Sequence, residues 1–188
     1  DIWDTFDGTT TGTKVSSSTS GGDIIVYALP TMVDGLSVSA SYSPQEGARS
    51  SSNAYAATYT GVEGLSVSYG VGEGEVTAVT NTDVDATTMK ASYAYGSFTV
   101  AYSNNDYQTE VANKDQETTS YKVSYTVSDA ISVSYGTEEI ALENDNQDAE
   151  YEMVTVAYTS GGMTVTAKQA SSTDALHGTT DLEDRDYW

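Results

Sequence analysis

The sequence predicts an all-β protein, a transmembrane antiparallel β-barrel of the up-and-down type. Ten short segments alternate apolar and polar residues, and the connections between them are alternately short and long. The clearest segment, residues 36–42, reads Leu-Ser-Val-Ser-Ala-Ser-Tyr. Because successive side chains of a strand point to opposite faces, one face carries Leu, Val, Ile and Tyr and the other carries Ser and Thr. Short turns at one end and long loops at the other complete the pattern of a membrane barrel.

The composition favours a membrane barrel over a soluble sandwich. Among 188 residues there are 15 Tyr but only 2 Phe, 2 Trp and 4 Met. A soluble β-sandwich of this length normally buries more large apolar side chains. A strand that faces lipid needs only one apolar face, and a water-filled lumen favours hydroxyls. No run of about 18 apolar residues is present, so a transmembrane helix is not expected.

The charge excludes one class of partner. Seven Lys and Arg stand against 28 Asp and Glu, which gives a formal charge of −21. Such a chain repels phosphate backbones, so we expect no nucleic-acid partner. There is no cysteine, hence no disulfide or thiol chemistry.

Ten strands follow from the alternation and from the residues that interrupt it. Pro30 ends the first strand, and Val33-Asp34-Gly35 turns the chain into the second. Short turns recur at 61–64, 96–97, 128–129 and 160–162, where glycine commonly supplies the positive φ of a tight hairpin. Longer, mostly acidic loops separate the hairpins. The expected strands are Asp23–Leu29, Leu36–Ser43, Asn53–Thr60, Leu65–Gly72, Thr87–Tyr95, Phe98–Ser103, Thr119–Val127, Ala130–Thr137, Glu150–Tyr158 and Met163–Ala170.

Tyrosines gather at the two ends of these strands. Aromatic belts at the two membrane interfaces are typical of a barrel, whereas a general strand preference of Tyr predicts no bias toward strand ends. The belt expected near the loops contains Tyr42, Tyr69, Tyr102 and Tyr135, with Tyr55, Tyr121 and Tyr151 beside them. The belt expected near the turns contains Tyr59, Tyr93, Tyr125 and Tyr158.

The other face of the strands is expected to line the lumen, where water can satisfy hydroxyl groups. Four charged residues are assigned to this face as well: Lys90, Lys122, Lys168 and Glu152. The hydroxyl residues in the same phase are Ser37, Ser39, Ser41, Ser66, Ser68, Thr88, Ser92, Thr99, Ser124, Thr126, Ser132, Ser134, Thr164 and Thr166.

Two segments give the pattern a family likeness. Residues 23–30 read Asp-Ile-Ile-Val-Tyr-Ala-Leu-Pro and are followed by Val-Asp-Gly-Leu at 33–36 and Ser-Tyr-Ser-Pro at 41–44. Residues 89–100 contain a Tyr-Ala-Tyr-Gly-Ser-Phe-Thr-Val hairpin. Together they resemble the Gram-negative general porins, which are trimeric barrels of about sixteen strands with a constriction loop folded into the pore.

The resemblance implies a partial barrel domain over residues 1–188. Residues 1–23 would be the end of the constriction loop, residues 23–170 ten meander strands, and residues 171–188 a long loop before an absent closing strand. The acidic side of the constriction would then be Asp1, Asp4 and Asp7.

The sequence therefore predicts an outer-membrane porin of a Gram-negative bacterium. We expect a cation-preferring, water-filled channel for passive diffusion of small hydrophilic solutes and ions. The expected partners are the lipid bilayer, lipopolysaccharide and two further copies in a homotrimer. The alternative is a secreted or surface-attached acidic β-rich adhesin or filament subunit.

No enzymatic activity or cofactor is expected. The single histidine, His177, has no motif around it that would support a Ser-His-Asp arrangement. Alternating oxygen ligands at 144–150 lack the spacing of an EF-hand, so weak Ca²⁺ binding by acidic loops is the most that we expect.

Overall fold

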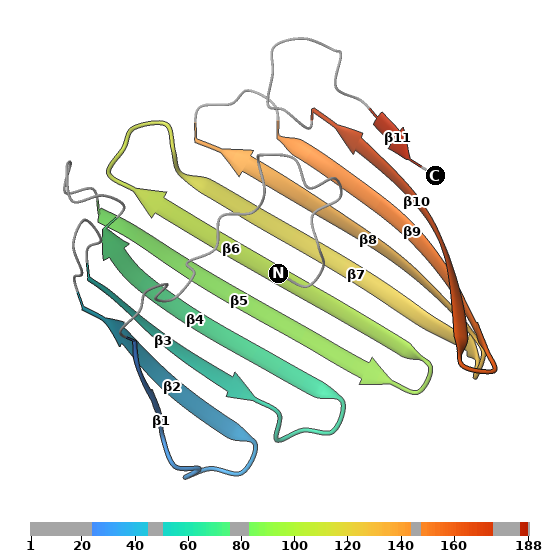
Figure 1. Ribbon diagram of the computed structural model, residues 1–188, viewed down its shortest axis with the longest axis horizontal. Helices are drawn as coiled ribbons and strands as arrows, with labels where there is room; N and C mark the ends of the chain where they lie inside the picture. Colours follow the sequence, from blue (N-terminus) through green and yellow to red (C-terminus); the bar gives the residue numbers. More distant parts are fainter. Residues whose placement is uncertain (1–23, 45–50, 76–82, 144–147, 175–184, 188) are drawn as a thin grey trace.

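The chain forms one curved antiparallel sheet in which every strand pairs with its neighbours in the sequence (Figure 1). The computed structural model describes residues 24–44, 51–75, 83–143, 148–174 and 185–187. The sheet has 11 strands in the order β1 to β11, and its two edge strands, β1 and β11, do not pair with each other. The strands are β1 (Ile25–Ala28), β2 (Leu36–Ser43), β3 (Ser52–Tyr59), β4 (Leu65–Glu75), β5 (Asp83–Tyr95), β6 (Phe98–Thr109), β7 (Gln116–Ser128), β8 (Ile131–Leu142), β9 (Ala149–Ser160), β10 (Met163–Thr173) and β11 (Arg185–Tyr187).

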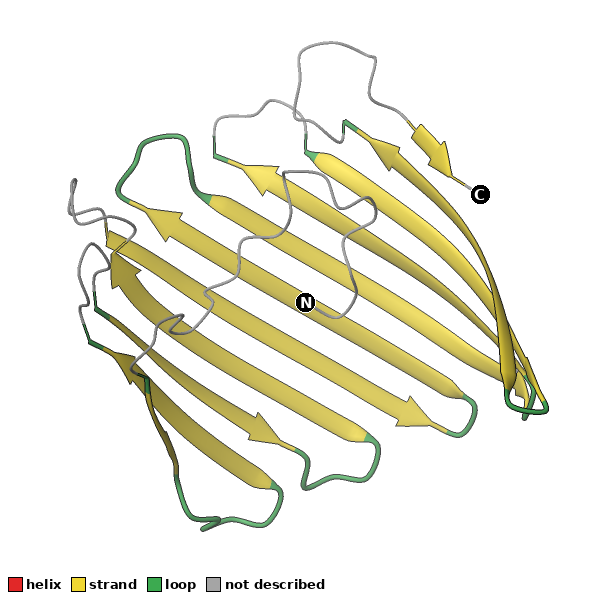
Figure 2. Ribbon diagram, in the orientation of Figure 1, coloured by secondary structure: helices red, strands yellow, loops and turns green. Residues whose placement is uncertain are grey.

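The short connections gather at one end of the sheet (Figure 2). Each hairpin is joined to the next one by a backbone hydrogen bond at this end. The amide of Thr60 donates to the carbonyl of Gly35 at 2.7 Å, and the amide of Ala94 donates to the carbonyl of Gly64 at 2.8 Å. Gly64 has φ +76°, and a Cβ there would overlap the carbonyl oxygen of Ala94. The turn therefore requires glycine for both its backbone conformation and its close contact.

Several strands extend further toward the loops than the sequence predicts. The prediction ended the sixth strand at Ser103 and began the seventh at Thr119, whereas β6 continues to Thr109 and β7 begins at Gln116. Both faces of these extensions are polar, so the two-residue alternation that reveals a strand is absent there. Residues 185–187 also form a strand, paired with Ala170–Ser172, within the region predicted to be a loop.

The described strands make a single layer with very little apolar core. The buried apolar cluster contains only Ile140, Ala149 and Tyr151. Large apolar side chains are instead exposed along the sheet, as with Val123 at 47% and Tyr121 at 56%. Within the described residues, no helix combines the length and the hydropathy needed to cross a membrane.

Candidate pore wall

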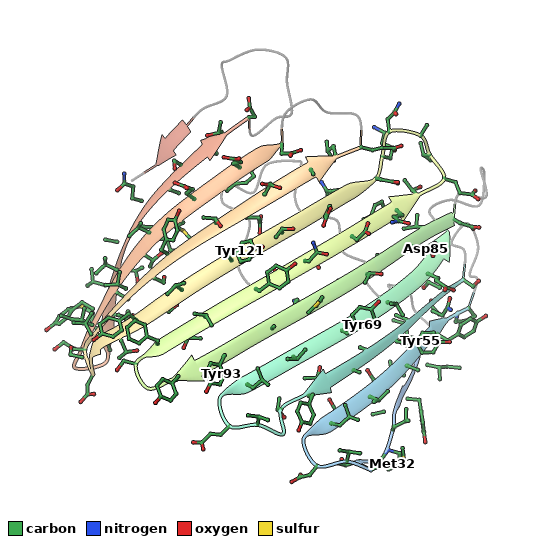
Figure 3. The ribbon with its side chains drawn as sticks, turned by 180° about the vertical axis from the view of Figure 1, so that it is seen from behind. Met32, Tyr55, Tyr69, Asp85, Tyr93 and Tyr121 are labelled. Atoms are coloured by element: carbon green, nitrogen blue, oxygen red, sulfur yellow. The ribbon has the colours of Figure 1, made fainter. Side chains whose placement is uncertain are left out.

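The two faces of the sheet differ in chemistry. All fourteen hydroxyl residues predicted to share one face do so in the observed register, which confirms that part of the prediction. One row across this face runs through cross-strand partners in β4 to β10: Ser68, Lys90, Ser103, Ser120, Glu138, Tyr151 and Ser172. We call it the hydroxyl face. The opposite side, the tyrosine face, carries Tyr69, Tyr93 and Tyr121, which Figure 3 labels.

Three of the four predicted charged residues lie on the hydroxyl face. Lys90 pairs with Ser68 and Ser103, and Lys168 pairs with Thr155, which itself pairs with Ser134. Lys122 is in the same phase, because it alternates with Ser120 and Ser124 along β7.

The assignment of Glu152 to this face is wrong. Glu152 pairs with Thr137 on the tyrosine face, and the Tyr135 hydroxyl donates to its Oε1 at 2.9 Å. Tyr151, predicted near the loop-side belt, lies instead on the hydroxyl face and is buried. Both errors have one cause: Met153 and Val154 are both apolar, so the alternation in this strand does not reveal its phase.

The tyrosines near the turns measure the tilt of the strands. Tyr59 pairs with Val67 of β4, and Val67 pairs with Ala91 of β5. The turn-side tyrosine of β5, Tyr93, lies two residues from Ala91. The same cross-strand row reaches β7 at Tyr121, four residues from Tyr125, and β9 at Glu152, six residues from Tyr158. The line therefore shifts by one residue per strand. A shift of ~3.3 Å for every ~4.8 Å between strands is a tilt of about 35°, within the range of membrane barrels.

Because the strands are tilted by this amount, the residues that lie at one height shift along the cross-strand rows by one residue toward the turns for each strand crossed from β3 to β10. We call a set of residues at one height a level. The three lysines lie at one level to within a residue. The row of Lys90 reaches β7 at Ser120, two residues and two strands from Lys122. The row of Lys122 reaches β10 at Ala170, two residues and three strands from Lys168. The lysines of β5, β7 and β10 thus form an arc across the hydroxyl face.

Carboxylates on the tyrosine face also share a level, on the loop side of the tyrosines. At this level each strand from β4 to β9 carries one carboxylate, and neighbours face each other in three cross-strand pairs. The pairs are Glu73 with Asp85, Asp106 with Glu117, and Glu139 with Glu150. Figure 3 shows Asp85 near the loop ends of the strands and Tyr93 near the turns.

The distance from these carboxylates to the turns matches a membrane. Glu117 is eleven residues from Ser128 at the end of β7, and Glu139 is eight residues from Ile131 at the start of β8. With ~3.3 Å per residue and a tilt of about 35°, these spans are about 22–30 Å high. A membrane barrel needs an outward apolar band of about 25 Å.

The two tyrosine belts are closer together than this band. Tyr102 pairs with Tyr121, and the turn-side line passes through Tyr125 on the same strand. Corrected for the one-residue shift between β6 and β7, the level of Tyr102 lies three residues from Tyr125, which is a difference in height of about 8 Å. Of the two, only the turn-side belt lies at an edge of the band, whereas Tyr69, Tyr102 and Tyr135 lie inside it, four residues from the carboxylates of their own strands.

Burial on the hydroxyl face changes at the level of the lysines. On the loop side of this level many side chains are buried, as with Ser103 at 0% and Thr118 at 1% exposure. On the turn side Thr126, Ser132 and Thr166 are exposed. The buried part is polar: the Ser120 hydroxyl donates to Glu138 Oε2 at 2.8 Å, and Glu138 is 2% exposed.

Glu138 was predicted to begin a loop, yet it continues β8 in the hydroxyl-face phase of Ser132, Ser134 and Gly136. The continued two-residue period was the signal that could have revealed its place. Near the loop end of β6, burial and the Asp115 carboxylate raise the pKa of Tyr107 above its usual value.

The predicted constriction residues, and two features that the sequence analysis considered and set aside as sites, lie outside the described residues. These are Asp1, Asp4, Asp7, His177 and most of the 144–150 segment. Among the residues that the structure describes, no group of three or more His, Cys, Asp or Glu side chains could hold a metal ion.

A family model of the Gram-negative porins matches residues 1–182. The chain belongs to the Gram-negative porin family. This membership confirms the resemblance seen in the sequence and locates the protein in the outer membrane. No curated protein matches the chain in sequence.

Two solved structures share the fold. One is a loop L8 deletion mutant of OmpT, an outer membrane protein of Vibrio cholerae, with a TM-score of 0.57 and 18% identity. The match covers 79% of this chain and 56% of that one. The other is OmpT folded in vitro, with a TM-score of 0.58 and 14% identity, covering 80% of this chain and 53% of that one. The chain thus spans about half the length of these barrels.

Proposed function

We propose that the protein is a channel for passive diffusion of small hydrophilic solutes and ions, and that the hydroxyl face lines its water-filled lumen. The observation that carries this proposal is the division of β2 to β10 into one face of hydroxyls with lysines and one face of exposed apolar side chains. Water in a lumen satisfies the hydroxyls, and lipid accepts the apolar face. A porin needs no catalytic residue, so we propose no enzymatic activity and no cofactor, with at most weak Ca²⁺ binding by acidic loops.

The tyrosine face is proposed to contact lipid between the turns and the carboxylates. Family membership implies an environment of bilayer and lipopolysaccharide, and we propose a homotrimer as its assembly. In a secreted adhesin the same face would expose many apolar side chains to water, well beyond the patches that soluble monomers tolerate. The adhesin alternative therefore gains no support from this sheet.

We further propose that Asp1, Asp4 and Asp7 form the acidic side of a constriction and that the channel prefers cations. The carboxylates of the described strands do not contribute directly, because all but Glu138 lie on the tyrosine face. The wall itself contributes the three lysines. A cation preference would therefore require the negative charge of the aspartates and the acidic loops to exceed the positive charge of the three lysines.

The test is recording from the full-length protein in a planar bilayer with a KCl gradient. Discrete conductance steps and a reversal potential of cationic sign are expected, and replacing the three aspartates by asparagine should reduce the preference. A reversal potential of anionic sign would refute the cation preference. Absence of conductance from correctly folded protein would refute the channel.

A further inference from the structure

Four aromatic side chains gather on the tyrosine face at the turn end of the β5–β6 hairpin. We call this set, Tyr93, Tyr95, Phe98 and Tyr125, the aromatic patch. The ring centroids of Phe98 and Tyr125 are 4.5 Å apart, and those of Tyr93 and Tyr95 are 6.4 Å apart. Tyr95 and Phe98 are cross-strand partners, so the two ring pairs adjoin each other. Their rings are open to the surroundings, because Tyr95 is 74% and Phe98 55% exposed.

The aromatic patch lies at the height expected for lipid headgroups. Tyr125 is three residues from Ser128 at the end of β7, which is about 8 Å of height at the tilt given above. Tyr95 and Phe98 directly flank the turn. The interfacial layer on each side of the hydrocarbon is about 5–8 Å thick. The exposed rings are therefore expected among headgroups rather than among acyl chains alone.

Both neighbouring turns place a carboxylate beside the aromatic patch. The β3–β4 turn, which is bonded to the end of β5 through Gly64, carries the exposed Glu63. On the other side the amide of Thr126 in β7 donates to the carbonyl of Ser97 at 2.9 Å. The exposed Asp129 follows three residues later in the β7–β8 turn. Neighbouring turns are two strand spacings apart, about 10 Å, so both carboxylates flank the rings closely.

Within the part of the chain that the structure describes, no basic residue lies near these two carboxylates. Lys122 of the lysine arc is six residues from Ser128, about 16 Å above the turns, and lies on the hydroxyl face. Lys114 is in the β6–β7 loop at the opposite end, and Arg185 pairs with Ser172 on the loop side of the arc. The turn-side rim therefore combines negative charge with open aromatic rings, and both attract a cation.

We propose that the aromatic patch binds the ammonium group of a zwitterionic phospholipid such as phosphatidylethanolamine, while Glu63 and Asp129 disfavour anionic headgroups. This inference rests on the proposed contact of the tyrosine face with lipid. An ammonium group is attracted to the face of an aromatic ring, and a primary ammonium also donates hydrogen bonds to carboxylates. Because the short turns of outer-membrane barrels face the periplasm, the lipid belongs to the periplasmic leaflet.

Elementary electrostatics gives the expected size of the preference. In water, one unit charge ~10 Å away weakens the binding of an anionic headgroup about twofold, so two carboxylates weaken it about fourfold. A ring beneath the ammonium favours the zwitterionic lipid by a further factor of about two to five. Phosphatidylethanolamine should therefore be preferred to phosphatidylglycerol roughly tenfold at low salt. At ~1 M salt, where the Debye length is ~3 Å, only the contribution of the rings should remain.

The test uses a fluorescent reporter beside the aromatic patch. Val100 lies on the tyrosine face as the cross-strand partner of Tyr93. Val100→Trp is made in the full-length protein, whose other tryptophans are replaced by phenylalanine. The protein is reconstituted in vesicles of phosphatidylethanolamine and phosphatidylglycerol, and one of the two lipids at a time carries brominated acyl chains. Bromine quenches tryptophan only at close contact, so the two quenching curves give the relative binding constant at this place.

Three further variants separate the contributions of charge and rings. Glu63→Gln combined with Asp129→Asn should lower the preference about fourfold at low salt and leave it unchanged at ~1 M salt. Tyr95→Leu retains an apolar side chain but removes a ring, so it should lower the preference about twofold or more at both salt concentrations. The matched control is Tyr69→Leu, on the same face but inside the apolar band, which should leave the preference unchanged.

The outcomes distinguish this inference from the proposed function. Equal quenching by the two brominated lipids would overturn the inference while the lipid contact stands. A preference that survives both Tyr95→Leu and the double carboxylate variant would overturn it as well. If neither lipid quenches the reporter, protein rather than lipid covers this part of the tyrosine face, and the proposed lipid contact itself is refuted.

Discussion

A positive charge should destabilise the protein when it is placed on the tyrosine face of β7 and should have little effect on the hydroxyl face. Val123 lies on the tyrosine face, six residues from Glu117 and five from Ser128, and is therefore near the middle of the proposed apolar band. Arginine at the midplane of a membrane barrel costs about 2–4 kcal/mol when it faces lipid. The Val123→Arg variant should lose that much stability, a roughly 30- to 700-fold change in the folding equilibrium, since ~1.4 kcal/mol is tenfold.

The neighbouring residue is the control. Ser124 lies at nearly the same height but on the hydroxyl face, where arginine can remain hydrated, so Ser124→Arg should change stability by about 0.5 kcal/mol or less. The assay is reversible folding of the full-length protein into phosphatidylcholine vesicles, followed by tryptophan fluorescence over a urea gradient. Equal losses in the two variants, or a larger loss for Ser124→Arg, would refute the assignment of the faces.

Three further changes test particular contacts. Gly64→Ala should destabilise the protein by at least about 1–2 kcal/mol in the same urea titration, because its φ is positive and the added Cβ overlaps the Ala94 carbonyl. Glu139→Gln should stabilise it by about 0.2–1 kcal/mol, less at high salt, because it removes the repulsion with Glu150 directly opposite. Lys122→Glu should raise the cation-to-anion permeability ratio roughly 30-fold at low salt, because two charge units at ~8 Å in water lower the energy of a cation by ~1 kcal/mol and raise that of an anion by the same amount; the reversal potential in a KCl gradient measures the ratio.

Each of these changes has an outcome that would contradict it. Gly96→Ala, where φ is +58° and nothing lies near the added Cβ, should cost less than Gly64→Ala, and an equal cost would argue against the overlap. Glu152→Gln has no carboxylate opposite and weakens the bond from Tyr135, so it should not stabilise the protein. An unchanged reversal potential in Lys122→Glu would remove that lysine from the ion path.

The sequence was sufficient to predict the hairpins and most faces because alternation is a local property. Leu36, Val38 and Ala40 alternate with serines, and no tertiary information is needed to divide them. The predicted faces were wrong in β9, because two consecutive apolar residues, Met153 and Val154, interrupt the alternation. Only the pairing of Glu152 with Thr137 settles which face this strand presents.

The residues that share a level on the sheet could not be predicted from the sequence, because their heights depend on cross-strand register and on the tilt of the strands. The lysine arc joins residues of β5, β7 and β10 that have no fixed sequence spacing, and the carboxylate pairs depend on the same information. The ends of β6 to β8 were missed because a barrel strand continues beyond the membrane, where its outward side chains, such as Asp106 and Glu117, are no longer apolar.

The hydroxyl face, and not the tyrosine face, is proposed to meet the water of a channel. The most direct measurement is modification of single cysteines during planar-bilayer recording of the full-length protein. Ser134 and Val133 are neighbours on β8 that lie on the hydroxyl and tyrosine faces, respectively. A charged methanethiosulfonate should change the single-channel current of Ser134→Cys in discrete steps and leave Val133→Cys unaffected. The reverse pattern, or a current that neither modification changes, would show that the hydroxyl face does not line the channel.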